Sequence, residues 1–345
     1  MQENSEQFSV KQLLGNAIPT KNIPRLLSLG FGIILLSWLV AQLEWSTTVD
    51  IIRNVPPSYL LLGGLCYITS FYLRALRFRL LLPLERNVGH LFPIVLVHYT
   101  ALNIIPARLG ELSYVYLLKK FNHISTGYSV SSLIIARVFD LIAISLLFLL
   151  SSLFVDLPSP WLQTVNLSVG GFLLGVIVIL MLILAYKERC VEWLKVRMSA
   201  KGWNRYTLVQ RVLNGLDEIV SALQSLRMRR RHPGKVFGLS LLIWLSIFSV
   251  NYLLLRAFEV NLSFIEIALV STFIILLTVL PFQMMNGLGI HETTWTFIAL
   301  SLGVPKHIAI VSAFGTHILS TLFLLIFAAY GFWKISHIPQ EPSRG

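Results

Sequence analysis

Charged residues are scarce in this chain of 345 residues: they make up 13% of it, whereas hydrophobic residues make up 55%. An average soluble domain is about 25% charged, so the chain has too few charges to cover the surface of one or two such domains. Several uncharged runs reach the length of about 20 apolar residues that crosses a bilayer. The composition therefore excludes a soluble globular protein and predicts an all-α polytopic membrane protein.

Cysteine is almost absent, since the chain has only Cys66, in an apolar run, and Cys190, at a basic loop. This pattern gives neither a disulfide framework nor a cysteine metal site. The Gly-x-Ser-x-Gly, His-Glu-x-x-His, P-loop and Cys-x-x-Cys patterns of common enzymes are also missing. Gly287 and Gly289 form a single Gly-x-Gly that lacks the strand and helix of a dinucleotide fold. We therefore expect no enzyme activity, no cofactor and no metal.

Acidic residues are outnumbered, with 16 Asp and Glu against 28 Lys and Arg, which gives a net charge of +12. Residues 187–235 hold 12 basic and 4 acidic residues, so this loop alone contributes +8. Nucleic-acid binding is one reading of a basic chain, but basic loops beside spans usually mark the cytoplasmic face. We expect a multi-pass membrane protein, with both termini and the loop in the cytoplasm and no nucleic-acid partner.

The apolar runs predict six spanning helices, at residues 26–43, 55–73, 130–155, 167–186, 236–255 and 307–333. The positive-inside rule leaves two further segments, 87–120 and 262–306, which must return to the side from which they came. Both contain proline, glycine and charge, so we expect two re-entrant or broken helix hairpins. Such backbone is tolerated at membrane depth only where protein or a water-filled cavity surrounds it.

The order of spans and hairpins predicts an inverted-topology repeat within one membrane domain, residues 26–333. Residues 26–155 run span, span, hairpin, span, and residues 167–333 repeat this order from the opposite side of the membrane, with the basic loop inserted. Interrupted apolar segments at matching positions in two halves indicate a transport site at the repeat interface. The N-terminal segment 1–25 and the tail 334–345 are expected in the cytoplasm.

The first hairpin carries charges beside residues that interrupt helices. Pro106 stops or kinks the incoming helix, and Gly110 permits an unusual turn or close packing. Arg108 and Glu111 are three residues apart, so on a helix they share a face. Ionisable groups at membrane depth indicate function by default, and arginine suits bidentate binding of phosphate. The alternative is a neutralised ion pair that fixes the hairpin.

Two further charged patterns lie on the predicted spans. Arg137 and Asp140 are three apart inside a span, so they form either a structural ion pair or a substrate contact. Arg74 and Arg77 share a helical face at the end of the second span. They either anchor that span at the level of the lipid phosphates or gather an anionic headgroup at the mouth of a cavity.

The second hairpin combines Pro281, Gly287 and Gly289 with the ionisable residues His291 and Glu292. This loop would present backbone N–H groups and a helix N-terminus to an anion. Glu292 would alternatively cap that helix. His291 is either a group that exchanges protons near neutral pH or a hydrogen-bonded structural residue.

The basic loop contains one amphipathic segment. Apolar residues recur at helical spacing through 206–226, and a run of arginines follows. The helix would lie on the inner leaflet, held by apolar burial and anionic lipid, or dock a partner enzyme through the 187–235 loop.

Four motifs follow one another in the chain. They are Arg74-x-x-Arg77-Phe78, Asn103-x-x-Pro106-x-Arg108-x-Gly110-Glu111, Arg137-x-x-Asp140 and Gly287-Leu288-Gly289-Ile290-x-Glu292. Together they resemble the flippase-like transmembrane region of the lysylphosphatidylglycerol synthase family, over about residues 26–333, in a stand-alone member without the soluble transferase domain. The resemblance implies movement of lipids between leaflets, with the charged motif residues and Asn103 at a central cavity. Tyr114 stands where the family often has another arginine, so the resemblance does not imply an aminoacylated phospholipid.

The sequence thus predicts a flippase- or scramblase-like transporter that moves a phospholipid or lipid-linked precursor through a polar central cavity. The lipid would be an anionic phospholipid, a glycolipid or a polyprenyl-linked molecule. One alternative is a scaffold that recruits a glycosyltransferase or lipid-modifying enzyme through 187–235. Another is a membrane enzyme that uses Glu111 or Glu292 as acid or base.

Overall fold

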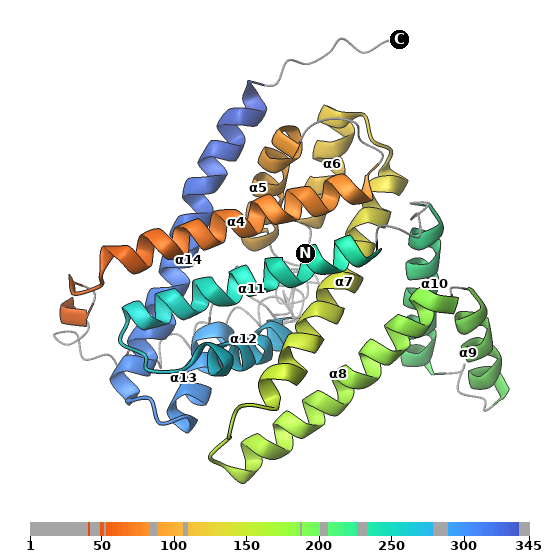
Figure 1. Ribbon diagram of the computed structural model, residues 1–345. Coiled ribbons are helices and arrows are strands. Elements are labelled where there is room, and N and C mark those ends of the chain that lie inside the picture. Colours follow the sequence, from red (N-terminus) through yellow and green to blue (C-terminus); the bar gives the residue numbers. More distant parts are fainter. Residues whose placement is uncertain are drawn as a thin grey trace, which may run out of the picture.

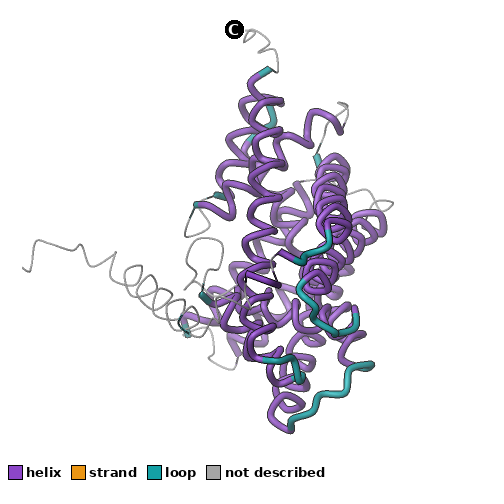
Figure 2. The backbone as a smooth tube through the Cα atoms, turned by 90° about the vertical axis from the view of Figure 1, so that its left-hand side faces the viewer, coloured by secondary structure: helices purple, strands orange, loops and turns teal. Residues whose placement is uncertain are grey.

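The computed structural model of the chain describes residues 41, 49–51, 53–82, 88–105, 110–186, 188–200, 206–225, 233–278 and 289–337. Within these ranges the chain forms helices joined by short loops, and no strand occurs (Figure 1 and Figure 2). The main helices are α4 (Pro57–Leu81), α5 (Val88–Ile104), α6 (Glu111–Asn122), α7 (Thr126–Ser152), α8 (Pro160–Tyr186), α9 (Glu188–Ala200), α10 (Thr207–Ser225), α11 (Pro233–Ala257), α12 (Phe264–Thr278), α13 (Ile290–Ser301) and α14 (Lys306–Ser336).

Five of the described helices are long and apolar enough to cross a membrane, namely α4, α7, α8, α11 and α14. They correspond to five of the six predicted spans, and the sixth, residues 26–43, lies almost entirely outside the described ranges. Helix α8 leaves Leu167 and Phe172 74% and 67% exposed, together with several other large apolar side chains. An apolar surface of this extent is unsuited to water and suited to lipid. The chain is therefore an all-α, multi-pass membrane protein.

Each predicted hairpin contains two helices that pack against each other: α5 with α6, the first hairpin, and α12 with α13, the second hairpin. Helix α6 starts after Gly110, and α13 starts after Gly289. Gly289 has φ 85°, a left-handed conformation that favours glycine. Gly110 has an ordinary φ of −57°, but a Cβ there would lie 2.3 Å from the carbonyl oxygen of Ala101 in α5. Of the two predicted roles for Gly110, close packing is confirmed.

The packing partners of the helices correspond when the two halves of the chain are exchanged. Helix α4 lies beside α11, its counterpart in the other half (Figure 1). The first hairpin contacts α14 through α5, and the second contacts α7 through α12. Likewise α6 packs on α7, and α13 packs on α14. This is the pattern that a two-fold repeat produces; the inverted orientation of the two halves and the repeat boundaries remain predictions.

The amphipathic helix of the basic loop packs on the membrane domain itself. Leu213, Val220 and Leu223 of α10 are buried, and α10 contacts α7. Partly buried Ile219 joins a cluster that includes Val138 of α7. Both readings of the 206–226 segment, a helix on the inner leaflet and a docking site, assumed a free apolar face. The structure corrects this, because much of that face is covered by the same chain.

Candidate functional site

A buried ion pair joins three spans. Arg77 of α4 is fully buried and donates hydrogen bonds to both carboxylate oxygens of Asp140 in α7, with 3.0 Å between Nη2 and Oδ2. Helix α11 adds Ser240, whose Oγ accepts a bond of 2.8 Å from Arg77, and Trp244, whose Nε1 donates to Asp140 at 3.0 Å. Burying a charge is costly unless it is paired and hydrogen-bonded. These contacts therefore fix α4, α7 and α11 relative to one another.

This pairing corrects two expectations. Asp140 pairs with Arg77 from another helix rather than with Arg137 on its own helix. Arg74 and Arg77 do not stand free at the level of lipid phosphates, since they are 7% and 0% exposed. Arg74 donates to Ser70 at 2.9 Å, and its guanidinium carbon lies 4.5 Å from the centre of the Tyr99 ring, a cation–π distance.

A second ion pair is partly open. Nη2 of Arg137 in α7 lies 3.2 Å from Oε1 of Glu111, and the two side chains are 49% and 35% exposed. Arg137 is the twelfth residue of α7, about 16 Å along the helix axis. It is two residues from the middle of this 27-residue helix, so a hydrocarbon layer about 30 Å thick that is centred on α7 would have Arg137 near its middle. Charged residues at this depth almost always face the bundle interior or a water-filled cavity.

The start of α6 positions Glu111. The close approach of Gly110 to α5 brings the first turn of α6 against that helix, and Ser113 contacts His98 of α5 at 3.2 Å. Glu111 is the first residue of α6, where the helix dipole favours a carboxylate. Asn103, near the end of α5, donates from its side chain to the carbonyl oxygen of Tyr99 at 2.7 Å, so its amide is bonded within its own helix.

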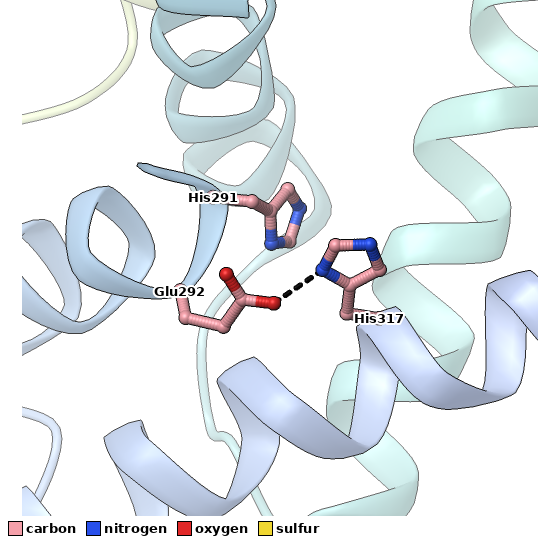
Figure 3. A group of neighbouring side chains, drawn as sticks. All are labelled: His291, Glu292 and His317. Atoms are coloured by element: carbon pink, nitrogen blue, oxygen red, sulfur yellow. Dashed lines mark hydrogen bonds and ion pairs between the residues drawn. The ribbon is translucent and has the colours of Figure 1, made fainter. Parts of the chain in front are cut away.

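The second hairpin holds a buried carboxylate. Oε2 of Glu292 accepts a hydrogen bond of 2.7 Å from the backbone N–H of Gly289, so the predicted cap of α13 is confirmed. Its other oxygen, Oε1, contacts Nδ1 of His317 in α14. The ring of His291 lies 5.1 Å from the ring of His317, and Figure 3 shows both imidazoles beside the carboxylate. Glu292 is fully buried, and His317 is 6% exposed.

Each hairpin forms one contact between a carboxylate and a side-chain nitrogen, and the two contacts correspond in position. In each half, a carboxylate from the first turn of the later helix of the hairpin, α6 or α13, contacts a nitrogen-bearing side chain on the span that follows. Glu111 contacts Arg137, and Glu292 contacts His317. Arg137 is the twelfth residue of α7, and His317 is the twelfth residue of α14. The first pair is partly exposed, whereas the second is buried.

Not every predicted site residue is placed by the structure. Pro106, Arg108, Pro281 and Gly287 lie outside the described residues. Sequence reasoning in turn missed His317, Ser240 and Trp244. His317 had a usable signal, because it is an ionisable residue inside the apolar run 307–333. Ser240 and Trp244 had none, since neutral polar residues are common in spans and their spacing does not reveal a partner.

Similarity to known proteins agrees with this architecture. The family model described as the lysylphosphatidylglycerol synthase TM region matches residues 25–328 of the chain. The chain belongs to this family. The motif resemblance is thereby confirmed, and the five apolar spans and both helix hairpins fall within or largely within the matched region.

One curated relative aligns with most of the chain at low identity. Glycosyltransferase AglD of Haloferax volcanii is 23% identical over 328 residues, which cover 86% of this chain and 52% of AglD. The chain thus spans about half the length of that relative. No solved structure matches the chain.

Proposed function

We propose that this protein moves a phospholipid or lipid-linked precursor between the two leaflets of the membrane, as a flippase or scramblase. The headgroup passes through a polar cavity while the acyl or polyprenyl tails stay in lipid. The proposal places the protein in the plasma membrane of a prokaryote, with both termini and the 187–235 loop on the cytoplasmic side.

The observation that carries this proposal is the exposure of the Glu111–Arg137 pair near the middle of the apolar helix α7. A half-exposed guanidinium in the middle of a span needs water around it, because lipid cannot solvate it. An exposed ion pair is worth only about 0–1 kcal/mol. A phosphate group can therefore replace Glu111 as the partner of Arg137 at little cost, and it forms two parallel hydrogen bonds with the guanidinium.

The buried pair is unsuited to the same role. Arg77 has no exposed surface, and its bonds to Asp140 are lost if a headgroup takes them. Removing one partner of a buried pair costs about 3–5 kcal/mol. The proposed headgroup contact is therefore Arg137, which Glu111 holds when no headgroup is bound. Arg108, which lies outside the described residues, is a further predicted phosphate ligand.

Leaflet exchange in liposomes tests the proposal. The purified chain is reconstituted with a headgroup-labelled lipid, the outer leaflet is quenched chemically, and the loss of inner-leaflet label is followed. Charge-assisted hydrogen bonds are worth about 1.5–3 kcal/mol, so Arg137→Gln is expected to slow exchange about 10- to 100-fold. Arg108→Ala is measured in the same assay.

The matched control is Lys195→Gln. It breaks an exposed ion pair with Asp217, 44% exposed on each side, on α9 and α10. This variant is expected to leave exchange unchanged. Equal rates for Arg137→Gln and the unaltered protein would contradict the proposed site. The absence of acceleration for anionic phospholipid, glycolipid and polyprenyl-linked lipid would contradict transport itself.

A scaffold function is the second candidate, because α9 leaves Trp193 and Val196 60% and 70% exposed. A partner enzyme, such as a glycosyltransferase, would bind this surface. Trp193→Glu would then abolish co-purification of the partner and leave leaflet exchange untouched. A transporter without a scaffold role shows neither effect with this variant.

A further inference from the structure

Three side chains that can bind a metal meet where α13 packs on α14. His291, Glu292 and His317 each offer one ligand atom, and these atoms all lie within 4.8 Å of one another. Figure 3 shows the two imidazoles and the carboxylate grouped around one small space. We propose that they bind a divalent transition-metal ion with the coordination preferences of Zn²⁺.

The donor set suits such an ion. Imidazole nitrogen and carboxylate oxygen are ordinary ligands of Zn²⁺, and two histidines with one glutamate form a known type of three-ligand site. Three protein ligands leave a fourth position for water or for an oxygen of a phosphate group. Each group binds the ion through an atom that carries no proton. These atoms are an oxygen of the carboxylate and one nitrogen of each neutral imidazole.

The separations are within reach of side-chain rotation. Ligand bonds of about 2.0–2.1 Å in a tetrahedral site place neighbouring ligand atoms about 3.4 Å apart. The observed limit of 4.8 Å therefore requires a contraction of at most about 1.4 Å. His317 contacts Glu292 through Nδ1, and the tautomer with its proton on Nε2 leaves Nδ1 available to the ion.

A second observation also indicates a missing ligand. Nδ1 of His291 is buried and has no hydrogen-bond partner among the described residues. A buried polar atom without a partner is unfavourable, and a metal ion would satisfy it. The carboxylate of Glu292 is oriented from behind by the N–H of Gly289 at 2.7 Å, as the outer hydrogen bonds of metal ligands usually are.

The first half of the chain supplies a natural comparison. At the position equivalent to His317 it has Arg137, a permanent cation with no lone pair for a metal. His317→Arg therefore gives the second hairpin the chemistry of the first: a permanent positive charge lies opposite Glu292, and one ligand is lost. His291→Ala removes the proposed ligand whose Nδ1 has no hydrogen-bond partner among the described residues. It keeps both the contact of Glu292 with His317 and the hydrogen bond of Glu292 with Gly289.

Metal binding is measured on the full chain, purified in detergent through an affinity tag without histidine and stripped with a chelator. Zn²⁺ is titrated in, bound metal is quantified by mass spectrometry, and Co²⁺ substitution reports tetrahedral coordination by its visible absorption. The unaltered chain is expected to hold one equivalent. Loss of an outer-shell partner alone typically weakens binding about 10- to 100-fold, so His317→Arg and His291→Ala should each weaken it by more than about 100-fold.

Glu111→Gln is the control, because it removes the equivalent carboxylate of the first half and should leave one equivalent bound. Melting temperatures of all variants, measured without metal, show whether each is folded. The inference is wrong if the unaltered chain binds no stoichiometric Zn²⁺, or if folded His291→Ala binds it as tightly. Because metal content is read directly, the result does not depend on whether the protein transports lipid.

Discussion

Replacing Asp140 with leucine and Arg77 with methionine, singly and together, measures how strongly the buried ion pair holds α4, α7 and α11 together. Asp140→Leu leaves a fully buried guanidinium whose remaining hydrogen-bond partner among the described residues is Ser240, and it also removes the acceptor of Trp244. Leaving one buried charge without its partner costs about 3–5 kcal/mol. We expect this variant to lie at the upper end of that range.

Arg77→Met is expected to cost less, about 3 kcal/mol. Asp140 keeps the hydrogen bond from Trp244 in this variant. The change also removes Nε of Arg77, a buried donor without a hydrogen-bond partner among the described residues. Each stranded group keeps one hydrogen bond, but a guanidinium with five N–H donors is left with more unsatisfied groups than a carboxylate with two oxygens.

The double variant decides between a coupled pair and two independent side chains. Replacing a buried ion pair with apolar residues of similar volume is often neutral or stabilising, so Arg77→Met/Asp140→Leu should lie within about 1 kcal/mol of the unaltered protein. The coupling energy would then be about 7 kcal/mol in magnitude, because the two single costs together far exceed that of the double variant. Reversible unfolding in mixed detergent–SDS micelles, followed by helical circular dichroism, measures all four proteins. If the unfolding free-energy costs of the two single variants simply add in the double variant, the two side chains are not coupled and the prediction is wrong. A stable double variant that no longer exchanges lipid would contradict the claim that this pair has only a structural role.

Two glycines give further tests through close packing. Gly110→Ala places a Cβ 2.3 Å from the backbone oxygen of Ala101, which cannot move aside, so it should cost about 1–3 kcal/mol and slow leaflet exchange. Gly315→Ala places a Cβ 2.1 Å from the ring of buried Phe258 and should cost a similar amount, about 1–3 kcal/mol, part of which Phe258→Leu restores. Gly171→Ala, where no atom lies within 4 Å, is the control for both, and unfolding midpoints equal to its own would contradict the packing argument.

Much of the fold followed from the sequence because lipid restricts what a chain can do. A span must be long, apolar and helical, so composition alone predicted five spans that the structure contains. Prolines, glycines and charges that interrupted apolar runs predicted the two hairpins, within which α6 and α13 start directly after Gly110 and Gly289. Both predictions depend on local properties of the chain, which are visible in the order of its residues.

The partners of the charged residues did not follow from the sequence. Spacing shows which residues share a face of one helix, but not which helix that face meets. Arg137 and Asp140 therefore resembled a pair, whereas they are neighbours on α7 that bond to α6 and α4 respectively. The apolar face of α10 posed the same problem, because its cover, α7, lies far away in the chain.

The ionisable residues differ in burial, and therefore in the ligands that they can bind. Arg77 and Asp140 are enclosed by three spans, and any ligand would have to replace bonds that hold those spans together. Arg137 lies one turn from Asp140 on α7 but is half exposed, so its guanidinium can exchange partners. His317 occupies the equivalent position of the second half but is buried, and its imidazole can accept a metal ion where arginine cannot. Corresponding positions of the two halves therefore suit opposite ligands, an anion in the first hairpin and a cation in the second.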